Sequence, residues 1–329
     1  MKLTEFEVQT PVGPVRRVGA VDDEELIDVT ASYGAVLAER GERRPAEIAA
    51  ITTPPEMLAF LRRGDRAFEA AREALEFAAE TDTSVGPDGA QLRYCREEVV
   101  RLGPLPRPNS IRDFMVVEEH VRNSLEEPPD AWYEMPVYYK GNPDTVVRPG
   151  ADVEWPAYTD RLDYELEIAA IVGKRGRDVP AERAEEYIAG YTIFNDFSAR
   201  DIQLREMSAQ LGPAKGKDFA NGLGPVLVTP DEIDVENLAV SARINGEVWS
   251  DGSLGEMYHS FAEIVEHVSQ AEPLHPGDVL GSGTVGNGCG LELDRWLEPG
   301  DEIELEAEGI GTLRHRVVDS ASTGASGSE

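Results

Sequence analysis

The chain contains little cysteine and little lysine. Its 329 residues include two cysteines, Cys95 and Cys289, which exclude a disulfide framework and predict a reducing environment. Only five of its 31 basic residues are lysines, whereas 63 residues are acidic, and the net charge is -32. A surface this acidic repels nucleic acid and anionic lipid, so we expect a small molecule as the partner. The composition also predicts adaptation to high salt, where ions screen charge repulsion.

Long apolar runs are also missing. No stretch approaches the roughly 18 apolar residues that span a membrane, and residues 1–11 lack the apolar segment of a secretion signal. We therefore expect a soluble, cytoplasmic protein without a membrane partner. The hydrophobic content of 41% is sufficient for a sizeable core in one or two domains.

The first hundred residues mix strand and helix signals. Residues 3–28 predict short strands separated by proline and glycine, and Thr53-Pro54-Pro55 predicts the start of a long helix. That helix would carry an apolar stripe at 3, 4 and 3 spacing, typical of a helix packed on a sheet. The stripe consists of Phe68, Ala71, Leu75 and Ala78.

Strand and turn signals dominate after a proline-rich linker at residues 104–108. Asn245-Gly246 predicts a tight hairpin, and one helix is expected near residues 257–268. The fold class is therefore predicted as α+β, with a small N-terminal α+β domain and a mainly β second domain. The predicted boundaries are 1–104 for the first domain, 105–319 for the second and 320–329 for a disordered tail.

Glu165 and Glu167 lie in a segment, residues 163–173, that otherwise predicts a buried strand. Side chains alternate across a strand, so these two carboxylates would share one face, about 7 Å apart. Each would lose hydration there and repel the other, which a bound cation would relieve. We interpret both as metal ligands.

Asp196 follows the apolar run 191–194, where a strand is expected to end. By itself an aspartate here is more often a helix N-cap. Together with Glu165 and Glu167 it would supply a third oxygen ligand. Three converging carboxylates would repel by about 4 kcal/mol per pair at about 4 Å and an effective dielectric constant near 20. A hard divalent cation removes that cost, with Mg²⁺ expected first and Ca²⁺ or Mn²⁺ as alternatives.

Asp113, His120 and Lys217 are the remaining reactive residues of interest. If residues 111–120 form a helix, the separation of seven places Asp113 and His120 on one face, although Asp113 could equally be a capping residue. His120 is the predicted general base. Lys217 belongs to a pair of lysines between glycines, and we interpret it as facing an anionic substrate in preference to a plain exposed loop lysine.

Taken together, these motifs resemble the fumarylacetoacetate hydrolase family over residues 105–319. The resemblance rests on Asp-Tyr-Glu-Leu-Glu-Ile at 163–168, on Asn-Asp-Phe-Ser-Ala-Arg-Asp-Ile-Gln at 195–203 and on Gly-Lys-Asp-Phe at 216–219. It implies a mixed β-roll catalytic domain and a homodimer. It also implies roles for individual residues: metal ligands Glu165, Glu167, Asp196 and Asp113; catalytic His120, Glu292 and Lys217; and substrate-binding Gln203, Tyr139 and Thr284.

The chain departs from the family pattern at several positions. Met115 and Met207 stand where fumarylacetoacetases carry tyrosines, and Pro129 falls where an anion-binding arginine is expected. Smaller members with acylpyruvase or decarboxylase activity carry a His-x-x-Glu pair, but Asn123 replaces that glutamate here. The resemblance therefore pairs His120 with Glu292.

The first functional hypothesis is a metal-dependent hydrolase that cleaves a carbon-carbon bond in a fumarylacetoacetate-like or acylpyruvate-like diketo acid. In it, His120 and Glu292 activate water beside a chelated 2-oxo acid, and Lys217 stabilises the enolate. The alternative uses the same metal site for dehydration, hydration, decarboxylation or isomerisation of a 2-oxo acid. A third hypothesis, from a different class, is a non-catalytic metal-stabilised scaffold or ligand-binding protein.

Overall fold

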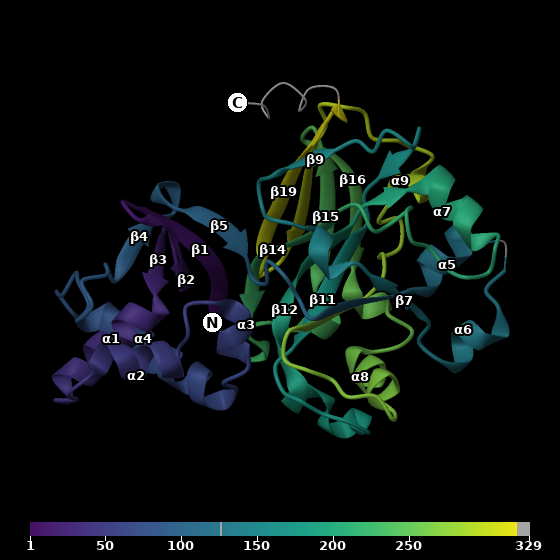
Figure 1. The fold of residues 1–329 in the computed structure, drawn as a ribbon. Helices are drawn as coiled ribbons and strands as arrows, with labels where there is room; N and C mark the ends of the chain where they lie inside the picture. The colour runs from purple at the N-terminus through teal and green to yellow at the C-terminus, as the bar shows by residue number, and fades with distance from the viewer. Residues whose placement is uncertain (126, 321–329) are drawn as a thin grey trace.

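The computed structural model describes residues 1–125 and 127–320. In this part of the chain, one twelve-stranded sheet joins the N-terminal third to the remainder (Figure 1). Its main path follows the order β4-β3-β2-β1-β14-β12-β11-β17-β6-β7, with β5 beside β1 and β8 beside β14. The strands are β1 (Lys2–Thr10), β2 (Gly13–Asp22), β3 (Glu25–Asp28), β4 (Arg93–Cys95), β5 (Val100–Gly103), β6 (Ser110–Phe114), β7 (Tyr138–Gly141), β8 (Val146–Val147), β11 (Leu166–Val172), β12 (Ile188–Asp196), β14 (Asn221–Val228) and β17 (Asp278–Gly281).

The predicted strands of residues 3–28 are confirmed as β1, β2 and β3. The long helix that carries the apolar stripe is confirmed as α4 (Asp65–Glu80), but its predicted start after Thr53 is wrong. A separate short helix, α3 (Met57–Leu61), comes first, and Gly64, whose φ is +60°, breaks the helical path between the two. Two earlier helices lack a strong apolar stripe and were not predicted. They are α1 (Val29–Glu39) and α2 (Pro45–Thr52).

A second sheet of five strands packs against the first. It follows the order β16-β15-β18-β19-β9, and its inward side chains join those of β11, β12 and β14 in the main hydrophobic core. The predicted hairpin is confirmed, because Asn245 and Gly246 both adopt positive φ between its first two strands. The strands are β9 (Asp152–Glu154), β15 (Ala239–Ile244), β16 (Glu247–Ser253), β18 (Glu302–Ala307) and β19 (Gly311–Val318); β10 (Leu162–Asp163) and β13 (Ser198–Ala199) form a separate pair.

Four short helices lie on the side of the catalytic region that faces away from α1, α2 and α4 (Figure 1). They are α5 (Glu118–Ser124), α6 (Asp130–Glu134), α7 (Arg200–Met207) and α9 (Gly290–Leu293). The helix predicted near residues 257–268 is confirmed as α8 (Phe261–Ser269), which starts at a capping box of Ser260 and Glu263. Short 3-10 helices are η1 (Arg96–Glu98), η2 (Pro143–Thr145), η3 (Ala181–Tyr187), η4 (Pro230–Glu232), η5 (Val235–Asn237) and η6 (Leu254–Glu256).

These observations confirm the α+β class with a mainly β catalytic region. The boundary at residue 104 stays a prediction, and β1 pairs with β14 across it. Most of the predicted disordered tail, residues 321–329, lies outside the described residues. Among the helices of residues 1–125 and 127–320, none is both long and apolar enough to cross a membrane.

Candidate active site

Three strands of the large sheet bring four carboxylates together. Asp113 lies on β6, Glu165 directly precedes β11, Glu167 is the second residue of β11, and Asp196 is the last residue of β12. Each offers one carboxylate oxygen, and these oxygens lie within 4.8 Å of one another. All four side chains are buried. The strand alternation expected for Glu165 and Glu167 therefore places both in one acidic cluster with the two aspartates.

Gly281 on β17 has no side chain, and the carboxylates of this cluster occupy the space where a side chain would lie. β17 pairs with β11 on one side and with β6 on the other, and Gly281 is in register with Ala169 and Asp113. A Cβ atom at residue 281 would overlap Asp113 Oδ1 and approach Glu167 Oε2. The absence of a side chain here is thus a condition for the carboxylates to converge.

Burial and mutual repulsion act on the protonation of the cluster. Burial, followed by the charge of Asp196, raises the pKa of Asp113 well above its ordinary value. Burial and the neighbouring charges of Asp113 and Glu165 do the same to the pKa of Glu167. Burial also raises the pKa of Asp196 to about 6, although Lys217 opposes it. An additional positive charge would stabilise the ionised cluster.

Two buried cations compensate part of the negative charge. Lys217 Nζ donates to Glu165 Oε2 at 2.6 Å and to Asp196 Oδ2 at 2.5 Å. Arg200 donates to Glu165 Oε1 at 2.7 Å and to Asp163 Oδ2 at 2.8 Å. Burial alone would raise the pKa of Glu165, but the charges of Lys217 and Arg200 hold it below its usual range.

The remaining oxygens of the cluster fit a divalent metal. Asp113 Oδ1 and Asp196 Oδ1 are buried and have no hydrogen-bond partner among residues 1–125 and 127–320. A buried ionised oxygen without a partner is energetically costly unless a cation binds it. Four carboxylates face two cations, one of them shared with Asp163, so negative charge remains in excess. An all-oxygen ligand set suits Mg²⁺, Mn²⁺ or Ca²⁺.

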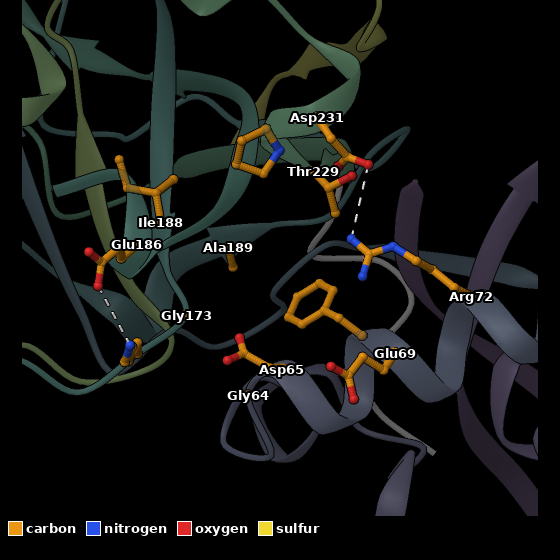
Figure 2. A pocket seen from close by; sticks show the side chains of 13 residues that line it. Gly64, Asp65, Glu69, Arg72, Gly173, Glu186, Ile188, Ala189, Thr229 and Asp231 are labelled. Atoms are coloured by element: carbon orange, nitrogen blue, oxygen red, sulfur yellow. Dashed lines mark ion pairs between the residues drawn. The ribbon is translucent and has the colours of Figure 1, made fainter. Parts of the chain in front are cut away.

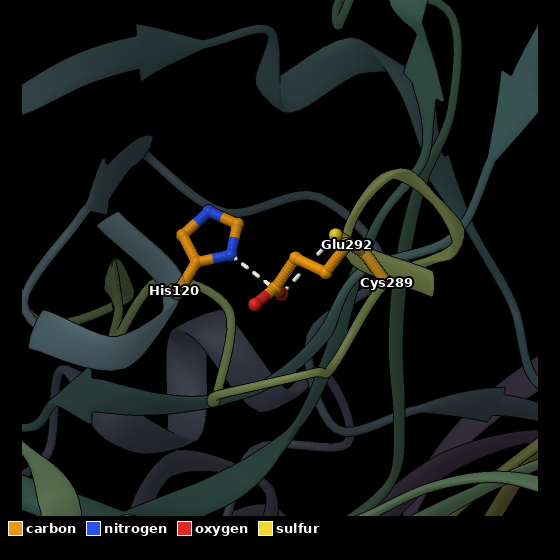
Figure 3. A group of neighbouring side chains, drawn as sticks. All are labelled: His120, Cys289 and Glu292. Atoms are coloured by element: carbon orange, nitrogen blue, oxygen red, sulfur yellow. Dashed lines mark hydrogen bonds and ion pairs between the residues drawn. The ribbon is translucent and has the colours of Figure 1, made fainter. Parts of the chain in front are cut away.

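His120 and Glu292 form a hydrogen-bonded pair beside the acidic cluster. His120 Nδ1 lies 2.7 Å from Glu292 Oε1 (Figure 3). Glu292 Oε2 accepts from Asn123 Nδ2 at 2.8 Å and from the backbone N–H of Asn287 at 2.9 Å. Burial would raise the pKa of Glu292, but these donors, led by His120, keep it below its usual value. An ionised Glu292 assigns the proton to Nδ1 of His120 and leaves the lone pair on Nε2.

Cys289 completes the group drawn in Figure 3, and its thiol lies 3.4 Å from Glu292 Oε1. Cys289, His120 and Glu292 are close enough to suggest a second metal site. However, burial raises the pKa of the Cys289 thiol well above its ordinary value, and a thiol must ionise to bind a metal well. This trio is therefore better described as a His-Glu pair supported by a neutral donor.

Asp113, Glu165 and Glu167 of the acidic cluster line the same cavity as His120, and its volume is about 280 Å³. The three predicted substrate-binding residues line it as well. Tyr139 Oη donates to Asp196 Oδ2 at 2.7 Å, and Thr284 Oγ1 donates to Glu167 Oε1 at 3.4 Å. Gln203 Oε1 accepts from Arg200 at 3.0 Å. The amide nitrogen of Gln203 makes no hydrogen bond within the described part of the chain and is a donor for a ligand oxygen.

A larger hollow, of about 450 Å³, lies between α4 and the loops after β11 and β14 (Figure 2). Its charged side chains include two long-range ion pairs, Arg72 with Asp231 at 4.0 Å and Lys174 with Glu186 at 3.9 Å. Neither cluster with metal-ligand spacing found in the described residues lies there. The smaller cavity therefore has the stronger chemical case for being the active site.

The structure brings the sequence-predicted residues together, but it corrects how they are arranged. Asp113 and His120 do not share a helix, because Asp113 belongs to β6 and His120 to α5. Sequence reasoning missed Arg200 and Asp163, whose buried ion pair supports Glu165. The sequence offered a signal for both, since Asp163 lies in the motif at 163–168 and Arg200 in the motif at 195–203.

Residues 110–318 match the family model described as fumarylacetoacetate (FAA) hydrolase, C-terminal. The chain belongs to this family. An oxaloacetate tautomerase of Bacillus subtilis, YisK, is 31% identical over 307 residues, which cover 90% of this chain and 94% of that protein. Human mitochondrial oxaloacetate tautomerase FAHD2A is 33% identical over 270 residues, or 81% of each chain.

Solved structures of the family share the fold. A fumarylacetoacetate hydrolase from Exiguobacterium antarcticum superposes with a TM-score of 0.71 at 27% identity, covering 96% of this chain and 99% of that one. A 5-carboxymethyl-2-hydroxymuconate delta-isomerase from Mycobacterium smegmatis gives a TM-score of 0.65 at 25% identity, covering 97% and 100%. The predicted family is thus confirmed, and the chain is a member of an enzyme family whose relatives include isomerases and tautomerases as well as hydrolases.

Proposed function

We propose that this protein is a metal-dependent tautomerase that moves a proton at the carbon beside the oxo group of a 2-oxo acid. One observation carries the proposal: His120 lines the same cavity as Lys217 and three of the four clustered carboxylates. A base and a cation site that face one small cavity are the minimum equipment for enolisation. The names of the relatives, oxaloacetate tautomerases over most of the chain, support the same reaction class.

The metal would be held by Asp113, Glu165, Glu167 and Asp196. When bound, it would supply a positive charge for the oxygens of the substrate and for the enolate. The convergence of the four carboxylates supports this set of ligands, and all-oxygen ligands support Mg²⁺ as the metal.

The protein's own groups would move the proton. Nε2 of His120 takes a proton from the substrate carbon, and ionised Glu292 stabilises the resulting imidazolium through Nδ1. In the opposite direction the imidazolium returns that proton to carbon, and the substrate oxygen exchanges its proton with water. Gln203 and Lys217 line the same cavity, where the amide nitrogen of Gln203 and the charge of Lys217 would bind substrate oxygens.

Hydrolytic cleavage of a carbon-carbon bond in a diketo acid remains the second candidate. The same His-Glu pair that removes a proton from carbon is suited to removing one from water. The two reactions differ in what lies next to His120 Nε2: a substrate C–H group in the tautomerase and a water molecule in the hydrolase. A homodimer in the cytoplasm also stays a prediction.

The products distinguish these functions. Enol-oxaloacetate and acetylpyruvate are incubated with the protein and Mg²⁺, and the reaction is followed by ultraviolet absorbance and product mass. We expect faster loss of the enol absorbance with unchanged substrate mass. Release of two shorter acids from acetylpyruvate would instead establish the hydrolase, and loss of carbon dioxide a decarboxylase.

His120→Gln tests the base. We expect the rate to fall by about 10²-fold to 10⁴-fold, while calorimetric Mg²⁺ binding stays unchanged because His120 is not among the carboxylate ligands. His275→Gln is the control, since His275 is exposed and does not line the cavity. An unchanged rate in His120→Gln would exclude this histidine as the base.

A further inference from the structure

One wall of the active-site cavity is apolar. Asp113, Glu165, Glu167, His120 and Lys217 are among the charged residues that line the cavity, while a second group of lining residues carries no charge. This apolar wall consists of Met115, Leu125, Val137, Leu204, Met207 and Leu291. A ligand that fills the cavity must therefore satisfy polar and apolar lining at once.

Helix α7 contributes both polar and apolar residues to the cavity lining. Arg200, Gln203, Leu204 and Met207 all line the cavity and follow the spacing i, i+3, i+4, i+7, which is one face of a helix. The N-terminal part of that face is polar and contacts the carboxylate cluster through Arg200. The C-terminal part is apolar and lies about 10 Å further along the helix axis at about 1.5 Å per residue.

The apolar part of this face is unusually open to solvent. Leu204 is 54% exposed and Met207 is 42% exposed, although both face a cavity. Covering such side chains with an apolar group is favourable because it removes hydrocarbon surface from water. A charged group placed against them would lose hydration and gain no partner.

The basic side chains that line the cavity already have partners. Lys217 pairs with Glu165 and Asp196, Arg200 pairs with Asp163 and Glu165, and His120 bonds Glu292. In the described residues, no further lysine, arginine or histidine lines the cavity. A second carboxylate on the substrate would therefore find no unpaired cation near the apolar wall.

We propose that the preferred substrate is a 2-oxo acid whose far end is an apolar group seated on Leu204 and Met207, and that a carboxylate at this far end weakens binding. This inference rests on the proposed function, because it takes the 2-oxo acid head to bind at the carboxylate cluster.

Unreactive analogues test the tail separately from the reaction. N-butyl oxamate and N-(3-carboxypropyl) oxamate carry the same two-oxygen head and differ in the far end. Their affinities for the Mg²⁺-loaded protein are measured by calorimetry. We expect the butyl compound to bind at least tenfold more tightly than the carboxylate-ended one. In a methyl-to-butyl series, affinity should rise by up to about fourfold per methylene.

A charge substitution provides the matched test. Met207→Arg places a cation at the exposed apolar end, so we expect the carboxylate-ended oxamate to gain at least fivefold in affinity and the butyl oxamate to lose affinity. Leu211→Arg is the control, because Leu211 is 94% exposed and does not line the cavity. It should change neither affinity.

The outcomes separate the two proposals. Equal or tighter binding of the carboxylate-ended oxamate by the unsubstituted protein would overturn the apolar-tail proposal alone, since the head would still bind. Failure of both oxamates to bind in the presence of Mg²⁺ would overturn the proposed function together with the tail. Tighter binding of the butyl compound, reversed only by Met207→Arg, would support both.

Discussion

At the scale of single residues, Glu292 shows how one carboxylate is fixed for a task. Its two oxygens receive hydrogen bonds from His120, Asn123 and the Asn287 backbone, and the Cys289 thiol is close by. These donors favour the ionised form and hold the carboxylate in one orientation. Smaller family members carry a glutamate at the position of Asn123. In this chain the asparagine cannot compete with Glu292 for His120, and it donates a hydrogen bond to Glu292 instead.

Asn123→Ala removes one of these donors without touching the cavity. Loss of this hydrogen bond should destabilise ionised Glu292 by about 1 kcal/mol. If the transition state loses the same stabilisation, the rate falls roughly fivefold. The pH-rate profile should shift as well, because the pKa of Glu292 would rise when a donor is lost. Kinetics across a pH series measure both effects.

Asn237→Ala serves as the control for Asn123→Ala. Asn237 is exposed, and in the described part of the chain its side chain bonds only to Asp234, the residue before η5. A rate and pH profile identical to the unsubstituted protein in Asn123→Ala would show that Glu292 does not depend on this donor.

At the scale of elements, neighbouring strands decide whether the carboxylates meet. Gly281→Ala would push Asp113 away, because the added Cβ overlaps its Oδ1. We expect Mg²⁺ affinity to fall on the order of tenfold to a hundredfold, as when groups that position a metal ligand are lost. Titration calorimetry measures the affinity, and thermal unfolding with and without Mg²⁺ measures the stabilisation.

Gly252→Ala is the matched substitution on another strand. Its added Cβ would lie 3.4 Å from Val285 Cγ2, an ordinary contact. Mg²⁺ affinity should be unchanged in this variant. If Gly281→Ala bound Mg²⁺ as tightly as Gly252→Ala does, the carboxylate cluster would not be the metal site.

The start of helix α1 carries a pH dependence of its own. Asp28 caps this helix by accepting from the Ala31 N–H, and burial raises the pKa of Asp28 to about 6, although Arg17 lies near. Since the folded-state pKa exceeds the unfolded value of 3.8, the ionised carboxylate destabilises the fold above about pH 6. That cost disappears as the pH falls below the unfolded value.

Asp28→Asn should therefore stabilise the protein in a pH-dependent way. Asparagine is an equally good N-cap, and it removes a buried charge. We expect the free energy of unfolding to rise by up to about 3 kcal/mol near pH 8, with the difference vanishing near pH 4. Denaturant unfolding at the two pH values measures it. A difference that grew as the pH fell would contradict this account.

At the scale of the whole molecule, the charge of -32 is the dominant feature. Repulsion among carboxylates opposes the compact state, and added salt shortens the range of that repulsion from about 10 Å at 0.1 M to about 3 Å at 1 M. We expect the unfolding temperature to rise by several degrees between 0.1 and 2 M KCl. A neutral osmolyte at matched osmolality is the control, and a falling unfolding temperature would refute the salt-adaptation prediction.

The sequence by itself determined the features that depend on near neighbours. Strand alternation predicted that Glu165 and Glu167 share a face, and Asn245-Gly246 predicted its hairpin, because both follow from local backbone geometry. The motifs around Asp196 and Lys217 were sufficient to identify the family. The shared helix considered as one possibility for Asp113 and His120 does not form, because a spacing of seven is compatible with more than one backbone path.

Only the tertiary structure decided what meets in space. Glu292 lies 172 positions after His120, and Asp113 reaches Glu167 because β17 pairs with both β6 and β11 around Gly281. Leu204 and Met207 of the apolar wall likewise line the cavity only because the fold places α7 beside the carboxylates. Periodicity fixes the face on which a side chain lies, whereas strand order over long separations fixes the distances between faces, and that order leaves no local pattern in the sequence.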